Sequence, residues 1–181
     1  PFNQPNVTEA KEQTAACLTE WNNSVPVLTP ACSEKSVEIF GDGQSLKDAL
    51  ATFIEDVKDG GYIAIMAYLD RRDDAAISEL RSILSKKSGR PVSFGWGPRF
   101  LHSTGQFHKG GAHNGGFLQI TADCKTDLAI PGKKFTFHEL LMAQALGDGE
   151  ALSARKLPVI RIHLKNRSEG IAEILKAVAK L

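Results

Sequence analysis

The segment between residues 99 and 116 gathers side chains that suit the recognition of a phosphorylated or hydroxylated ligand. Arg99 and Lys109 can donate charged hydrogen bonds, and a guanidinium is suited to bidentate contact with a phosphate. The segment also holds neutral hydrogen-bonding side chains and glycines that let a main chain approach a ligand closely: Ser103, Thr104, Gln106, Gly110 and Gly111. We therefore predict a ligand site here.

The glycine content of this segment predicts an irregular conformation. Glycine at this density costs too much backbone entropy for a regular helix or strand. Its glycines permit positive φ and close approach of the main chain to a ligand, as in loops that cradle anions. Long irregular loops in compact domains are usually functional or disordered, so a surface loop without a ligand is the alternative.

Three histidines in the same segment add groups that titrate near neutral pH. They are His102, His108 and His113, and no nearby Cys or Glu completes a metal-binding set at a known spacing. We therefore predict no metal and no cofactor.

Composition limits the possible partners. The formal net charge of the chain is +1 at pH 7, so no basic surface predicts nucleic-acid binding. No apolar run approaches the roughly 20 residues of a membrane span. Cys17, Cys32 and Cys124 lack a CxxC spacing and indicate reduced thiols, so we expect a cytoplasmic protein.

The elements that must position the segment alternate between strand and helix from residue 37 onward. This alternation predicts an α/β fold: a three-layer sandwich with a mostly parallel sheet of about five strands, preceded by an N-terminal helix. We expect helices to begin near Ser45, Thr136 and Ser168, and the helix after Thr136 to end at Gly147. The expected strands are 37–40, 62–69, 91–96, 117–121 and 159–164. Ligands in such sheets sit beyond the carboxyl ends of the strands, where the 99–116 segment begins.

The first part of the chain is expected to be a helix from about Pro1 to Trp21, followed by a linker through residue 33. Lys11 falls on or beside the apolar face of this helix. Its periodicity favours a lysine with a buried stem and a solvated ammonium. The other interpretation is a lysine that the helix carries into the site of a neighbouring domain.

Two sets of motifs resemble a known family. The opening Pro1-Phe-Asn-Gln-Pro-Asn-Val-Thr-Glu-Ala-Lys11 resembles the closing motif of phosphoglucose isomerases, a Phe-Asp/Asn-Gln run followed seven residues later by a lysine. The remainder resembles the C-terminal extension of bifunctional transaldolase/glucose-6-phosphate isomerase fusion proteins. The motifs that carry this second resemblance are residues 97–111, 117–121 and 143–148.

The resemblance implies that residues 1–33 are the C-terminal helix and linker of an isomerase, and that residues 34–181 form an α/β C-terminal domain. It implies interconversion of glucose 6-phosphate and fructose 6-phosphate, with Gln4 contacting substrate and Lys11 assisting ring opening. The glutamate base and the sugar-phosphate loop of the family would lie in preceding sequence, so the chain alone is expected to be inactive. The implied partners are a sugar-phosphate substrate, the upstream isomerase and transaldolase domains and, as an open alternative, a second copy of the chain.

His108 is a further candidate catalytic residue. Gly105-Gln-Phe-His108 resembles the Gly-Gln-His string of the isomerases, with Phe107 inserted and with the order of the motifs reversed relative to the lysine. Two alternatives to a catalytic contribution stay open: a non-catalytic sugar-phosphate-binding domain with its site at residues 99–116, and a docking domain.

Overall fold

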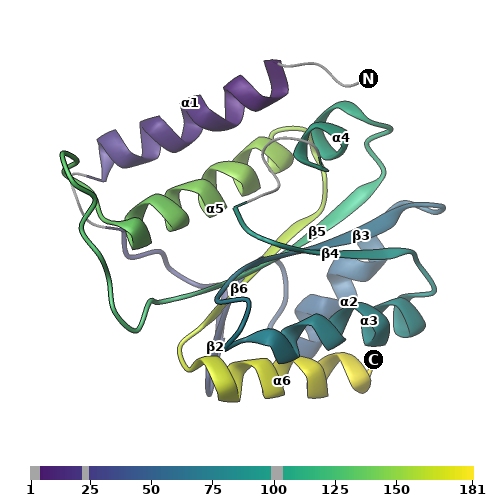
Figure 1. The fold of residues 1–181 in the computed structure, drawn as a ribbon. Helices are drawn as coiled ribbons and strands as arrows, with labels where there is room; N and C mark the ends of the chain where they lie inside the picture. The colour runs from purple at the N-terminus through teal and green to yellow at the C-terminus, as the bar shows by residue number, and fades with distance from the viewer. Residues whose placement is uncertain (1–4, 22–24, 99–103) are drawn as a thin grey trace.

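The computed structural model describes residues 5–21, 25–98 and 104–181. A mixed, mostly parallel six-stranded sheet lies between two layers of helices, with strand order β1-β2-β6-β5-β3-β4 (Figure 1). The four strands from β6 to β4 are parallel, whereas β2 runs antiparallel to β6 and β1 antiparallel to β2. The predicted α/β class, the mostly parallel sheet and the N-terminal helix are confirmed.

The elements are α1 (Pro5–Glu20), β1 (Cys32–Glu34), β2 (Val37–Phe40), α2 (Leu46–Asp56), β3 (Tyr62–Tyr68), the 3₁₀ helix η1 (Ala75–Glu79), α3 (Leu80–Ser88), β4 (Val92–Trp96), α4 (Thr104–Gly110), β5 (Gly115–Ala122), α5 (Phe137–Ser153), β6 (Val159–Leu164) and α6 (Arg167–Ala179).

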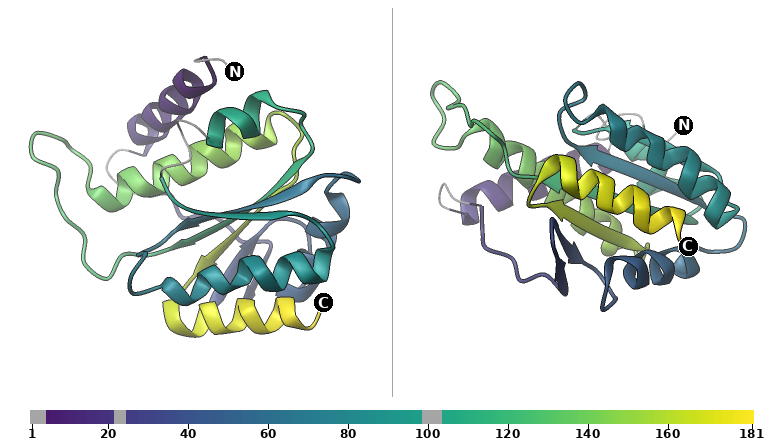
Figure 2. Two further views of the ribbon diagram at one scale, coloured as in Figure 1. Left: turned by 45° about the vertical axis from the view of Figure 1, so that its right-hand side comes forward. Right: turned by 90° about the horizontal axis from the view of Figure 1, so that it is seen from below.

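The two faces of the sheet are chemically different. Helices α2, α3 and α6 cover one face, and α1, α4 and α5 lie on the other (Figure 2). Alternate residues of a strand point to opposite faces, so a strand can be apolar on one side and polar on the other. On the α2–α3–α6 face the central strands contribute only apolar side chains to the larger core, among them Ile63, Ile65, Leu118, Ile120 and Ile162.

The opposite face, toward α5, is mixed. It carries a smaller apolar cluster that includes Met66 and Phe117. The buried polar side chains Gln119, Thr121 and Arg161 alternate in sequence with the apolar residues that face the other core. The pocket and the buried polar residues described in the next subsection lie on this face.

Two predicted helix starts are confirmed and one is wrong. The Ser45 side chain accepts a hydrogen bond from the Asp48 backbone N–H, and Thr136 forms a capping box with Glu139. The last helix is capped by Asn166, not by Ser168, because the Asn166 side chain accepts from the Glu169 backbone N–H. Asn is at least as good an N-cap as Ser, and it stands two residues earlier.

The predicted end of α5 at Gly147 is also wrong, because the helix continues to Ser153. Gly147 lies where α1 crosses α5: a Cβ there would be 3.3 Å from the Thr14 backbone nitrogen. Two residues on, a Cβ at Gly149 would be 2.9 Å from Gln119 Oε1. Both glycines therefore permit close packing of the helix, one against α1 and the other against the sheet, at the cost in helix propensity that glycine carries.

The predicted linker contains one element that the sequence pattern did not indicate. Residues 32–34 form the edge strand β1, where Cys32 pairs with Ile39 in an antiparallel register. Only three residues long, this strand offers too little alternation to recognise, which is why the expected count of strands was one short. The division of the chain into residues 1–33 and 34–181 stays a prediction.

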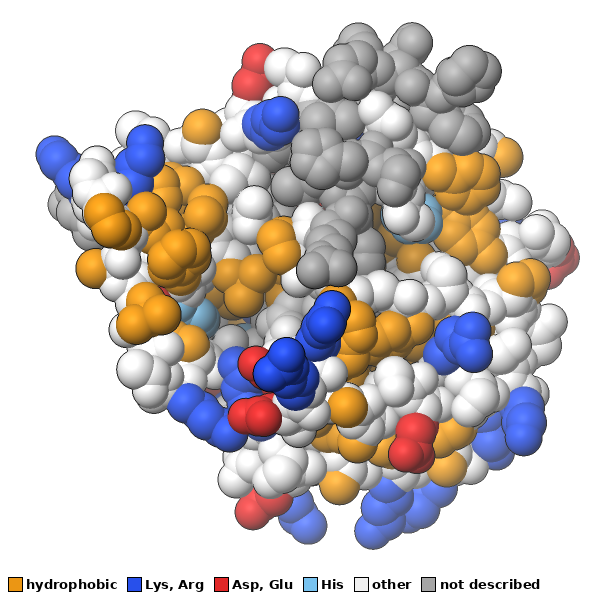
Figure 3. All heavy atoms as spheres, viewed as in Figure 1, with side chains coloured by type: hydrophobic (Ala, Val, Ile, Leu, Met, Phe, Trp, Pro, Cys, Tyr) orange, Lys and Arg blue, Asp and Glu red, His pale blue; other side chains and the backbone are white. Residues whose placement is uncertain are grey.

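No helix in the described ranges is long and apolar enough to cross a membrane. On the face shown in Figure 3, Lys and Arg side chains over the lower half are interspersed with Asp and Glu.

Candidate functional site

The described part of the predicted ligand segment is not an irregular loop. Residues 104–110 form helix α4, and Gly115 and Gly116 are the first residues of β5. None of the segment's described glycines has positive φ, whereas His113 does, at 50°. The glycines are needed for packing: a Cβ at Gly116 would be 2.3 Å from Val57 Cγ2, and one at Gly115 would be 2.7 Å from the Tyr62 ring.

The position of α4 also differs from the expected place at the carboxyl ends of the strands. His108 contacts the rings of Tyr62, the first residue of β3, and Phe117, near the start of β5. Helix α4 therefore covers the amino ends of these strands. Among the predicted site residues that the structure describes, Thr104 borders the carboxyl ends of β3 and β4, where it lines a pocket of about 400 Å³ with Asp70 and Trp96.

Lys109 is buried in an ion pair. Its Nζ lies 3.0 Å from Asp148 Oδ1, and each of the two side chains is only 2% exposed. The Tyr68 hydroxyl donates to Asp148 Oδ2 at 2.9 Å. Burial raises the pKa of Asp148, and the Lys109 ammonium and the Tyr68 hydroxyl oppose this rise. The ammonium is thus already neutralised by a carboxylate, which leaves little of its charge for a phosphate.

His108 is buried as a neutral imidazole. Its Nδ1 lies 2.6 Å from the Tyr62 hydroxyl, and the residue is 5% exposed. Burial lowers the pKa of His108 to about 4, with a further contribution from the Lys109 ammonium. At neutral pH this side chain can hydrogen-bond and pack, but it reaches no ligand unless α4 moves. Its catalytic contribution stays a prediction.

The remaining predicted residues of the segment have varied surroundings. Thr104 and Gly110 are exposed, and Gln106 and Gly111 are half-buried. Gln4, Arg99 and Ser103 lie outside the described residues. Of the predicted residues that the structure describes, His108 and Lys109 are the two that are buried.

Lys11 has the opposite surroundings. It is exposed on α1, whose Thr14 and Cys17 are buried. Apart from residues 5–7, 9 and 10, whose side chains are not described, no side chain of the described residues forms a hydrogen bond or ion pair with Lys11. The stripe of α1 that faces α5 is centred on Thr14 and Cys17, and Lys11 lies to its side. The buried stem favoured by periodicity stays a prediction.

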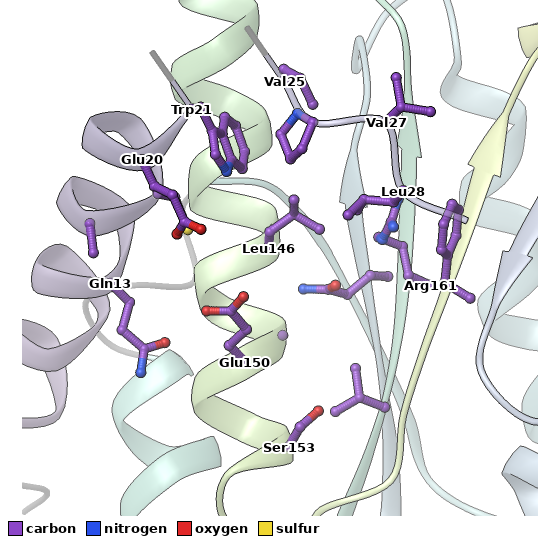
Figure 4. A pocket seen from close by; sticks show the side chains of 17 residues that line it. Gln13, Glu20, Trp21, Val25, Val27, Leu28, Leu146, Glu150, Ser153 and Arg161 are labelled. Carbon is purple, nitrogen blue, oxygen red and sulfur yellow. The ribbon is translucent and has the colours of Figure 1, made fainter. Parts of the chain in front are cut away.

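Sequence reasoning missed a pocket on the mixed face of the sheet. A pocket of about 940 Å³ lies between the second half of α1, residues 25–28, α5 and β6 (Figure 4). Arg161 and Gln119 line it from paired positions on adjacent strands. The alternation of Arg161 and His163 with Ile160, Ile162 and Leu164 was the available signal, since polar residues at period two inside a central strand mark a polar face.

Among the residues that line this pocket, Arg161 is the cationic one, and Glu20 and Glu150 are the two acidic ones. Its guanidinium carbon lies 3.6 Å from the centroid of the Phe40 ring, and the residue is 7% exposed. Burial lowers the pKa of Arg161 to about 10, and the carboxylate of Glu38 opposes this shift. The side chain therefore stays protonated at neutral pH, although no carboxylate of the described residues lies within ion-pair distance of it.

No protein-family model matches the chain, and no curated protein matches it. Among solved structures, the chain is similar to hypothetical protein TT0462 from Thermus thermophilus, with a TM-score of 0.61 and 16% sequence identity. The similarity covers 74% of this chain and 39% of that one, so this chain spans well under half of the matched protein. At this identity the likeness shows the fold alone.

Proposed function

We propose that this chain is the C-terminal portion of a glucose-6-phosphate isomerase, within a transaldolase/isomerase polypeptide, and that its chemical contribution is Lys11. The lysine would donate a proton to, or stabilise charge on, the ring oxygen as glucose 6-phosphate or fructose 6-phosphate opens. Proton transfer between C2 and C1 then needs a base, which we assign to a preceding domain. The proposal rests on the opening motif, Phe2-Asn-Gln4 with Lys11 seven residues later.

One structural observation supports this proposal above the alternatives: Lys11 is exposed on a helix whose buried Thr14 and Cys17 hold it in place beside α5. Gly147 lets α1 approach α5 closely at Thr14, one turn from Lys11. An exposed ammonium on an anchored helix is free to enter the site of an adjoining domain. By contrast, Lys109 and His108 are buried, which weakens the alternative of a sugar-phosphate site at residues 99–116.

The test is the Lys11→Ala variant of the intact enzyme that contains this chain. We expect kcat to fall about a hundredfold or more, the scale of a lost general acid, with a smaller change in KM. Lys11→Arg keeps the charge but not the proton-transfer chemistry and should recover little of kcat. As a matched control, Lys87→Ala on α3 removes a comparable exposed lysine and should leave kcat unchanged.

An unchanged kcat in Lys11→Ala would remove this residue from the mechanism. The chain of 181 residues on its own should show no isomerase activity. Turnover by the isolated chain would contradict the assignment of the base to a preceding domain.

A further inference from the structure

We propose that the pocket between α1, residues 25–28, α5 and β6 binds a small polyol that carries a phosphate or carboxylate group, with Arg161 at the anionic end. This site is separate from Lys11 and does not depend on the proposed isomerase function. Its volume of about 940 Å³ lies within the range of roughly 300–1,000 Å³ typical of small-ligand sites.

The surroundings of Arg161 indicate where the anionic group of the ligand would bind. A buried charge is costly unless it is paired, and the contacts of Arg161 supply a π face beneath the guanidinium but no carboxylate at ion-pair distance within the described ranges. The guanidinium lines the pocket, so an anion entering from the pocket side can pair with it. Phe40 holds the planar group from below, which orients it before a ligand arrives.

The opposite wall of the pocket indicates where the hydroxyl groups of the ligand would bind. Glu20 from α1 and Glu150 from α5 line the pocket across from Arg161 (Figure 4). These two carboxylates form no ion pair with Arg161, so they can accept hydrogen bonds from ligand hydroxyl groups and repel a second anionic group. A ligand that matches the pocket is therefore anionic at one end only.

Two amides complete the hydrogen-bonding capacity. Gln13 Oε1 is buried, finds no hydrogen-bond partner among the described residues, and belongs to a side chain that lines the pocket. Gln119 is held in place because its Nε2 donates to the Ala145 carbonyl at 2.8 Å. A buried acceptor without a donor costs free energy, and a ligand hydroxyl would satisfy it.

The apolar parts of the wall suit the C–H faces of a sugar or polyol. Trp21 and Leu28 approach the pocket from the end of α1 and from the segment after it (Figure 4). Aromatic and aliphatic groups beside a few fixed polar groups are the usual composition of a small-molecule site.

The test is titration calorimetry of the chain with glucitol 6-phosphate, gluconate and glucitol. These probes share a polyol and differ in bearing a phosphate, a carboxylate or no charge, so they identify the anionic group. We expect saturable binding of at least one of the two anions, and at least about tenfold weaker binding of glucitol. Absence of binding by both anions at about 10 mM would overturn the proposal.

Two variants locate the binding. Arg161→Gln should weaken the anion at least about tenfold, on the scale of a charged hydrogen bond. Ala16→Trp places an indole in the pocket from an exposed position of α1, and it should abolish binding without removing any buried contact. If circular dichroism shows that Arg161→Gln does not fold, Ala16→Trp tests the site by itself. An unchanged affinity in Ala16→Trp would overturn the proposed site.

Two controls separate binding in the pocket from nonspecific charge attraction and from binding near Lys11. Arg81→Gln removes an exposed arginine on α3 and should leave the affinity unchanged. Lys11→Ala should also leave the affinity of the pocket unchanged. Failure of the binding proposal and failure of the isomerase proposal can therefore be told apart. Equal loss in Arg81→Gln would show nonspecific charge attraction and contradict the pocket.

Discussion

Lys11 and Lys109 are both cationic residues of predicted sites, yet the fold gives them opposite surroundings. Lys11 is exposed on α1 and contacts no charged group in the described part of the chain, whereas Lys109 on α4 is buried against Asp148. A lysine in solvent retains its charge and its mobility for a substrate. A lysine paired with a buried carboxylate is part of the packed interior. Its removal leaves the carboxylate buried without a charged partner and lowers the free energy of unfolding.

The same contrast extends to two arginines: Arg167 at the start of α6 and Arg161 on the mixed face of the sheet. Arg167 pairs with Asp74, so its charge is balanced within the chain. Arg161 has a π contact and a more distant carboxylate, Glu38, and it faces a pocket. A charged side chain that has an ion-pair partner within the chain stabilises the fold, whereas one without such a partner can bind a ligand.

The largest expected effect is on stability, at Lys109. Lys109→Met leaves the Asp148 carboxylate buried without its partner, so we expect the free energy of unfolding to fall by about 3–5 kcal/mol. Urea denaturation monitored by circular dichroism measures this change. The double variant Lys109→Met/Asp148→Asn removes both charges and should recover most of the loss. A loss below about 1 kcal/mol in the single variant would mean that Lys109 is solvated like a surface lysine, and it would contradict the buried ion pair.

A smaller effect concerns His108 and pH. Its pKa of about 4 in the folded chain lies below the ordinary 6.5, so protons bind preferentially to the unfolded chain between these values. The stabilisation is therefore complete above pH 6.5 and is lost as the pH falls toward 4, by up to about 3 kcal/mol in total.

Denaturation of the wild type and of His108→Gln at pH 7.5 and pH 5 measures this contribution. The stability difference between the two proteins should shrink at the lower pH, because Gln does not titrate. Other buried groups such as Asp148 are present in both proteins and cancel in the comparison. A difference that is independent of pH would mean that the imidazole is hydrated and titrates normally.

The smallest expected effect on stability is at Lys11. Lys11→Ala should change the free energy of unfolding by less than about 0.5 kcal/mol, as for surface positions without specific contacts. The same denaturation series measures it beside Lys109→Met. Paired with the expected loss of kcat in the intact enzyme, this result would give Lys11 a functional contribution without a structural one. Destabilisation of more than about 1 kcal/mol would assign it a structural contact.

Much of the architecture follows from local patterns. The apolar run at residues 62–69 and the alternation elsewhere predicted strands that the structure contains, and the side chains of Ser45 and Thr136 began their helices as expected. These features depend on interactions within a few residues, so local sequence is sufficient. The edge strand at residues 32–34 depends on pairing with β2, which local sequence does not reveal.

The glycines show where local reasoning fails. The pattern predicted a helix end at Gly147 and an irregular ligand-binding segment at residues 99–116. In the structure, Gly147, Gly149 and Gly116 permit close contacts between elements. A glycine lacks a Cβ in every setting. Whether that absence serves a turn or a close approach depends on which element lies opposite it.

The amino-acid sequence by itself determined the order of strands and helices, the mostly parallel sheet, and the presence of cationic and polar groups in the first helix and in residues 99–116. Only the tertiary structure decided which of these charges meet solvent and which meet a partner. It placed Asp148 beside Lys109 across 39 residues of sequence and left Arg161 facing a pocket. The physical reason is that burial and pairing depend on contacts between residues distant in the chain, whereas helix and strand periodicity depends on neighbours.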